Sequence, residues 1–379
     1  MNVDEQRTTL AAEIAAELEL SLDGAAATLA AKLRDSRRLR DDLAALGLMH
    51  RVDKTPTPGV LDVMGIAVGS RSLPAFGGLL YGTSVHGHRL RMDGTTIAQA
   101  NEQVQVHLGD LDYYETSQRM RWKRMQHTYE LLDAVLEQRG GARLVLLDVP
   151  IFVSRGEDRN REHIEDVEEE WLEMVDVLNG FWRRRLDQFS PANEQGMVIA
   201  SVQAQNALSL FTALHNNPQT SADTVGQSLP DFIRAEWRRL RRAGMSRLLE
   251  QLLRGGMRTV AYSFEDTNLE PRWEPQALHH SGILGFFMRV GDRTPVWQVQ
   301  VAGHRSQWTS EQLDRVARHI AQATLSTGST AEPLPLWYAR RLASFPESAL
   351  IVFRDLVQTR LSGDTSDGAE AANGATSET

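Results

Sequence analysis

Residues 144–150, with the sequence Leu-Val-Leu-Leu-Asp-Val-Pro, constrain the fold of this chain more than any other stretch. A short apolar run that follows a Gly-Gly pair is typical of a β-strand buried on both faces of a sheet. Because proline cannot donate to a central ladder, this strand must end close to Asp148. The end of a buried strand is where α/β sheets usually carry a ligand or metal site. Asp148 is therefore the first candidate site residue.

A second candidate carboxylate, Glu130, lies in a segment from about Gln118 to Gln138 with the composition of a helix. A helix that is followed by a tight turn can fold back and hold Glu130 near Asp148. Two neighbouring carboxylates bind Mg²⁺ or Mn²⁺ better than one alone. The alternative is that Asp148 caps the next segment and Glu130 is a solvated helix residue.

Composition excludes several classes of protein. The chain has 379 residues, of which 41% are hydrophobic and 24% charged, as expected for a globular protein with a large core. It contains no cysteine, so disulfides, thiol nucleophiles and Cys-ligated metal sites are excluded, and a reducing cytoplasm is the expected location. No apolar run approaches the roughly 18 residues that cross a bilayer, so no membrane association is expected. The net charge of −9 argues against unspecific coating of nucleic acid by the whole surface.

The chain divides into three parts. Residues 1–54 are rich in Ala, Leu, Glu and Arg, which predicts an N-terminal appendage of two or three helices with breaks at Asp23-Gly24 and Asp35-Ser36. The proline-rich stretch 55–59 marks a boundary. Residues 60–361 form the main α/β domain, with a helical insertion at about 215–255. Residues 362–379 are small and polar, which predicts a disordered tail.

Inside the main domain we expect strands at 65–70, 78–86, 89–93, 144–147, 196–203, 258–264, 282–290 and 296–301. Residues 102–138 are expected to be helical, with a break near Gly109. His86 and His88 have the spacing of two metal ligands on one face of a strand, but no third ligand is apparent, so an exposed hairpin is the preferred interpretation.

A basic amphipathic helix is predicted to begin at Asp231. Its apolar residues alternate with arginines, including Arg234, Arg238, Arg239 and Arg242. One interpretation is a surface helix held by its apolar stripe. The other is a face that binds DNA phosphates or an acidic partner.

The order of these pieces resembles the NurA family of DNA-end-processing nucleases over roughly residues 60–360. The resemblance rests on a strand that ends in Gly69-Ser70, a helix with Glu130, and a strand that ends in Leu147-Asp148. It continues with a strand that ends in Ser-Val-Gln at 201–203, a Pro-Val-Trp-Gln-Val-Gln strand at 295–300, and a Pro-Leu-Pro-Leu helix entry at 333–336. The resemblance implies a ribonuclease-H-like mixed sheet flanked by helices, Mn²⁺ or Mg²⁺ as cofactor, a homodimer, and a HerA/FtsK-type hexameric ATPase as partner.

The family's metal site carries over only in part. The resemblance assigns Glu130 and Asp148 as metal ligands and catalytic residues, although Val149 replaces the glycine of the family's Leu-Asp-Gly motif. Val68 stands where the family has an aspartate, and Arg340 where it has a histidine. Gln203 stands where the family often has a lysine. Two of the four metal-site groups are therefore missing.

Three functions remain open from the sequence. The first is a NurA-like subunit that binds DNA together with the ATPase in DNA repair or anti-phage defence, with nuclease activity weak or lost. The second is an active divalent-metal-dependent DNA nuclease, which would require another carboxylate, such as Asp62 or Asp93, to reach Asp148. The third is an unrelated α/β protein. The N-terminal helices and the basic helix are the candidate surfaces for the ATPase or DNA.

Overall fold

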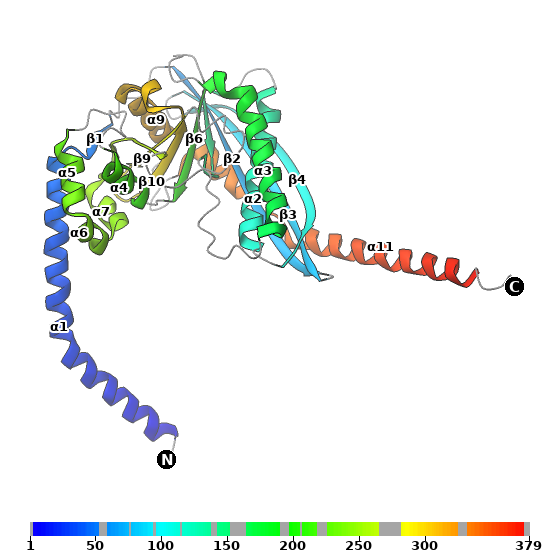
Figure 1. Ribbon diagram of the computed structural model, residues 1–379, viewed down its shortest axis with the longest axis horizontal. Helices are drawn as coiled ribbons and strands as arrows, with labels where there is room; N and C mark the ends of the chain where they lie inside the picture. Colours follow the sequence, from blue (N-terminus) through cyan, green and yellow to red (C-terminus); the bar gives the residue numbers. More distant parts are fainter. Residues whose placement is uncertain are drawn as a thin grey trace.

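The computed structural model describes residues 3–52, 59–75, 77–93, 96–113, 116–137, 142–151, 164–189, 197–204, 207–217, 226–264, 282–324 and 332–374. Within these residues the chain folds into a mixed sheet with helices on both faces (Figure 1). No helix of the described part is long and apolar enough to cross a membrane.

The sheet has ten strands among the described residues, in the order β1-β7-β9-β10-β6-β5-β2-β3-β4, with β8 paired to β9. Strand β5 runs parallel to both of its neighbours, β2 and β6. All the other pairs are antiparallel. The strand bounds are β1 Met49–Arg51, β2 Val60–Ala75, β3 Gly78–Asp93, β4 Thr96–Leu111, β5 Leu144–Leu147, β6 Val198–Ala204, β7 Met257–Thr259, β8 Tyr262–Ser263, β9 Ile283–Arg289 and β10 Trp297–Ala302.

Strand β5 lies at the centre of the sheet, as its sequence predicts. All four residues are at most 1% exposed, because β2 and β6 cover both edges and apolar side chains cover both faces. The strand ends at Leu147, directly before Asp148, which confirms the prediction from Pro150.

Helices lie in two layers. One face of the sheet is covered by α2 Thr116–Glu137, α3 Ile164–Arg185, α4 Ala207–Asn216, α5 Ser228–Ala235, α6 Trp237–Ala243 and α7 Met245–Leu252, together with the short helix η2 Leu186–Phe189. The other face is covered by α9 Ser310–Ala323 and α10 Leu334–Leu342, with η4 Arg305–Gln307 leading into α9. The chain begins with α1 Val3–Ala45 and ends with α11 Glu347–Gly374.

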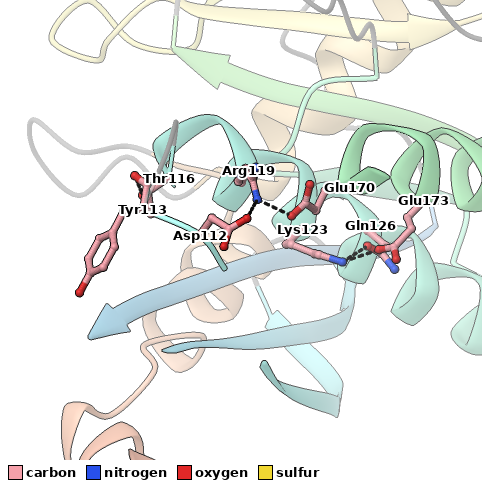
Figure 2. Close-up of polar contacts among 8 residues, drawn as sticks. All are labelled: Asp112, Tyr113, Thr116, Arg119, Lys123, Gln126, Glu170 and Glu173. Carbon is pink, nitrogen blue, oxygen red and sulfur yellow. Dashed lines mark hydrogen bonds and ion pairs between the residues drawn. The ribbon is translucent and has the colours of Figure 1, made fainter. Parts of the chain in front are cut away.

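Helix α2 is joined to α3 by a set of ion pairs, which Figure 2 shows. Arg119 is only 2% exposed, and its guanidinium contacts the carboxylates of Asp112 and Glu170. One turn further along α2, Lys123 pairs with Glu173. These contacts fix the rotation of α2, which decides which of its side chains face the sheet.

Three expectations about local structure need correction. Residues 96–111 form strand β4 rather than the beginning of a helix, so the predicted helix over 102–138 is restricted to α2. The N-terminal segment is one helix, α1, that continues through both predicted breaks. The basic helix predicted from Asp231 is divided into α5, α6 and α7.

The ends of the main domain also differ from expectation. The last turns of α1 belong to the core, since Leu39 and Leu43 are fully buried. Helix α11 extends to Gly374 and so passes through Ser362, where the disordered tail was predicted to begin. Residues 375–379 and 152–163 lie outside the described residues. In Figure 1 the long exposed parts of α1 and α11 project from the body of the protein in different directions.

Candidate functional site

The polypeptide around Asp148 is held in place by the strands on either side of β5. The backbone N–H of Asp148 donates to the carbonyl of Ile66 on β2 at 3.1 Å. On the other side, the amide of Gln203 on β6 donates to the Asp148 carbonyl at 2.6 Å. The next turn is fixed by Gln300 on β10, whose side chain accepts from the backbone N–H of Ile151 at 2.8 Å. Asp148 therefore has a defined position at the carboxyl end of β5.

Helix α10 approaches this position because β2 presents small residues to it. A Cβ on Gly65 would lie 2.3 Å from the Pro335 carbonyl carbon, and one on Gly69 would lie 1.7 Å from the Ala343 carbonyl oxygen. Both distances are far below van der Waals contact, so any larger residue would push α10 away from the sheet. Glycine at these two positions thus brings Arg340 of α10 to the end of β5.

Two guanidinium groups face the Asp148 carboxylate. Nε of Arg340 lies 3.6 Å from Oδ2, and Nη2 of Arg124 on α2 lies 3.9 Å from the same oxygen. Arg124 also donates to the carbonyl of Val68 at 3.1 Å, and Arg340 donates to Glu332 at 2.7 Å. The Asp148 side chain is 7% exposed. Its carboxylate therefore lies between two cations and has little contact with water.

The pKa of Asp148 reflects this environment. Burial raises the pKa of the carboxyl above its usual value, and the nearby guanidinium groups of Arg340 and Arg124 partly oppose that rise. The arginines act as the counter-ions that a buried carboxylate needs.

The structure places Glu130 in a different environment. Its carboxylate accepts from Gln126 at 3.1 Å, and Oε2 lies 3.8 Å from Nε2 of His107 on β4. Ligand atoms of Glu130, His107 and His127 all lie within 4.8 Å of one another. Among the described residues this is the only group of three or more His, Asp or Glu side chains with such spacing, and Asp148 is not part of it. Glu130 and Asp148 are thus members of two separate sets of contacts.

Neither of the alternative carboxylates lies at the Asp148 end of the sheet. Asp62 is at the opposite end of β2, next to Val63, which pairs with the first residue of β5. There it binds the guanidinium of Arg89 through both oxygens, at 2.8 and 2.7 Å. Asp93 pairs with Val60, further along in the same direction. Val68, at the expected aspartate position, is 4% exposed and belongs to the apolar core.

A two-metal centre does not fit the residues around Asp148. Such a centre requires several carboxylates around two cations roughly 3.5–4 Å apart. Here one carboxylate is already contacted by two cationic side chains, and the position expected to supply a second acid is a valine. Like-charge repulsion from Arg124 and Arg340 would oppose the entry of a divalent ion.

The four arginines predicted to bind a partner are not equivalent. Arg239 pairs with Asp35 of α1 and with Glu236, and therefore joins α6 to α1. Arg234 contacts Asp231 and the His215 carbonyl. Arg238 and Arg242 are exposed, and neither forms an ion pair within the described part of the chain. These two remain available for a partner.

Sequence reasoning missed Arg124 as a member of the site. In the sequence, Arg124 is one of several basic residues of the segment that forms α2. The rotation of α2 against the sheet and α3 decides which of these residues reaches β5. The small residues Gly65, Ala67 and Gly69 carried a usable signal, because they alternate on one face of β2 and so indicate close approach of another element.

Comparison with known proteins gives no sequence relative, since no protein-family model and no curated protein matches the chain. Solved structures do match. The NurA nuclease from Sulfolobus solfataricus has a TM-score of 0.54 at 11% identity, over 96% of this chain and 98% of its own. A NurA bound to dAMP and manganese gives 0.46 at 9% identity, over 92% and 96%. Human endonuclease V gives 0.32 at 13%, over 81% and 94%.

At these identities the likeness establishes the fold and nothing finer, and it rests on the first of the three structures. This chain has the fold of the NurA nuclease, with a mixed sheet flanked by helices. The fold class predicted from the sequence is therefore confirmed.

Proposed function

We propose that this chain is a NurA-like subunit of a DNA-processing complex in which the nuclease centre of the fold is weak or lost. The observation that carries the proposal is the pair of guanidinium groups, from Arg124 and Arg340, on the Asp148 carboxylate. A nuclease of the two-metal type needs negative charge at this position to hold its ions. In this chain the negative charge is already balanced by side chains.

The role that remains is to bind DNA and a motor protein. A HerA/FtsK-type hexameric ATPase as the partner, a homodimer as the assembly, and repair or anti-phage defence as the pathway are what the resemblance implies. Arg238 and Arg242 supply exposed positive charge on α6, suited to DNA phosphates or to an acidic partner surface.

Helix α1 offers a second docking surface, which we assign to the ATPase. Its outer part carries large apolar side chains that are 45–63% exposed: Leu10, Ile14, Leu18, Leu22, Leu29 and Leu33. Their spacing of mostly four residues places them on one side of the helix. A continuous exposed apolar stripe of this length is typical of a surface that a partner covers.

The experiment is a cleavage assay on linear DNA with Mn²⁺ or Mg²⁺, with and without the partner ATPase. Wild type, Asp148→Asn and Val68→Asp/Arg340→His are compared. The expected result is slow or no cleavage by wild type under all conditions and a gain of cleavage in the double variant, which restores an acid and a histidine at the two replaced positions.

The outcome that contradicts the proposal is rapid cleavage by wild type that Asp148→Asn lowers by more than roughly 100-fold, the scale expected when a metal's contribution of several kcal/mol is lost. That result would establish an active nuclease at this site. Rapid cleavage that survives Asp148→Asn would place the chemistry elsewhere in the protein.

A further inference from the structure

A second constellation lies between strand β4 and helix α2, and it shares no residue with the Asp148 site. His107 comes from β4, and His127 and Glu130 come from adjacent turns of α2. The two imidazole rings are stacked, with centroids 3.7 Å apart and planes 4° from parallel. The Glu130 carboxylate lies beside them, 3.8 Å from Nε2 of His107. Two nitrogens and one carboxylate oxygen thus lie within 4.8 Å of one another.

Each of the α2 side chains is oriented by a neighbour that leaves its ligand atom free. The Thr83 hydroxyl lies 2.7 Å from Nδ1 of His127, so Nε2 is the nitrogen of that ring open to a ligand. Gln126 donates to Oε1 of Glu130. Nζ of Lys123 lies 3.4 Å from the side-chain oxygen of Gln126 (Figure 2). Hydrogen-bond partners that fix ring and carboxylate orientation are the usual support of a metal site.

The charge state of the two histidines also suits a metal ligand. Burial, followed by the effect of His107 and Lys123, lowers the pKa of His127 to about 3, and burial lowers the pKa of His107. Both rings are therefore neutral near pH 7, the form in which imidazole coordinates metal. Nε2 of His107 is buried and makes no hydrogen bond within the described residues, so a polar atom at this point lacks a partner.

We propose that His107, His127 and Glu130 bind one divalent transition-metal ion of the Zn²⁺ class. Two imidazoles and a carboxylate are a donor set that favours such ions over Mg²⁺, which prefers oxygen ligands. The ion would connect the edge strand β4 to α2. This proposal is independent of the proposed function, because it does not involve Asp148 or either of its arginines.

Access and geometry determine how the ion enters. His127 is 4% exposed, whereas the side chains of His107 and Glu130 are 29% and 32% exposed, so the ion reaches the site from the His107 side. Glu130 also lines a groove between α2 and α3, in which Asp133 is paired with Arg184 and Arg185 and Asp176 supplies a further carboxylate. Because imidazole lone pairs lie in the ring plane, parallel rings cannot both point at one ion. Binding therefore turns His107, the more exposed ring, out of the stack.

The test is titration of the metal-free full-length chain with ZnCl₂ by calorimetry. We expect one Zn²⁺ per chain, and affinity at least roughly tenfold weaker in His107→Gln and in Glu130→Gln, because loss of a ligand costs no less than loss of a supporting partner. The matched control is His215→Gln, which changes a histidine at the end of α4 and should bind as wild type does. MgCl₂ at the same concentration should give no binding.

A second measurement on the wild type alone avoids any effect of the substitutions on folding. Zn²⁺ should slow the modification of His107 by diethyl pyrocarbonate, followed by mass spectrometry, while the modification of His215 should be unchanged. The proposal is overturned if wild type binds no Zn²⁺, if the two site variants bind as tightly as wild type, or if Zn²⁺ leaves the reactivity of His107 unaltered.

Discussion

The substitution Arg340→Met tests whether guanidinium groups compensate the buried charge of Asp148. Methionine keeps most of the length and apolar contact of the side chain but removes its charge. The variant leaves Asp148, which is 7% exposed, with Arg124 at 3.9 Å as its remaining cation. Since Arg340 lowers the pKa of Asp148, its removal should raise that pKa further and destabilise the folded state at pH 7.

The expected coupling free energy between Arg340 and Asp148 follows from the distance between the two charged groups. Coulomb's law at the observed 3.6 Å gives about 4.6 kcal/mol for an effective dielectric constant of 20, and about 1.2 kcal/mol for that of water. Arg340 is 29% exposed, so solvent screens the pair and the value lies between these limits. We expect a coupling free energy of about 2 kcal/mol between Arg340 and Asp148.

A double-mutant cycle separates this coupling from the other contacts of Arg340, which also donates hydrogen bonds to Glu332 and to the Val202 carbonyl. Wild type, Arg340→Met, Asp148→Asn and the double variant are unfolded in urea at pH 7, and the four free energies of unfolding are combined. The matched control is Arg354→Met, which breaks an exposed ion pair with Asp355 on α11 and should cost less than about 0.5 kcal/mol. A coupling below about 0.5 kcal/mol for Arg340 and Asp148 would refute the idea that arginines replace metal ions as counter-charges.

Arg238→Glu/Arg242→Glu should weaken binding to DNA or the ATPase and change the free energy of unfolding by less than about 0.5 kcal/mol, measured by anisotropy and urea unfolding; unchanged binding to both would exclude this surface. Affinity for DNA should be the same in EDTA and in Mn²⁺ at equal ionic strength, and a tenfold difference would contradict a metal-independent DNA surface. Burial and nearby arginines lower the pKa of His319 to about 4. Its contribution to the free energy of unfolding is therefore present above pH 6.5 and lost as the pH falls toward 4. His319→Gln should make the midpoint of urea unfolding depend less on pH over that range. Leu43→Ala should cost about 2–5 kcal/mol and Leu22→Ala less than about 0.5, in urea unfolding, because Leu43 is fully buried and Leu22 is 63% exposed.

The centre of the sheet was predictable because its signal is local. Residues 144–150 predict a strand, its burial and the residue where it ends from one heptapeptide, and all three predictions agree with the structure. Strand β4 was missed although Val104, Val106 and Leu108 alternate with polar residues, because the composition of the following helix was extended backwards over them. Alternation with a period of two was the better guide.

The single long helix α1 was missed for an energetic reason. A glycine inside a helix costs about 1 kcal/mol relative to alanine, which is too little to break a segment with many good helix formers on both sides. Gly24 therefore remains helical. Asp35 also remains helical. There a tertiary contact helps to stabilise the helix, because Asp35 pairs with Arg239 of α6.

The candidate site was predictable only in part because its composition is set by elements far apart in the chain. The absence of an acid at Val68 and of a histidine at Arg340 was visible in the sequence. The sequence did not show that Arg340 and Arg124 converge on the same carboxylate, because this depends on how α10 and α2 pack on opposite faces of the sheet. The same packing directs Glu130 toward His107 rather than toward Asp148.

In the proposed function, the charges around Asp148 are balanced without a bound ion. Asp148 and Glu332 supply two negative charges, and Arg124 and Arg340 supply two positive ones, with Arg340 in contact with both acids. A centre that is neutral by its own side chains gains little from binding a divalent cation and offers no excess positive charge to a DNA phosphate. The proposed affinity for DNA would then come from other surfaces, and exposed arginines such as Arg238 and Arg242 are suited to that role. The geometry that brings acids together in a metal-dependent nuclease would here stabilise the junction of β5, α2 and α10.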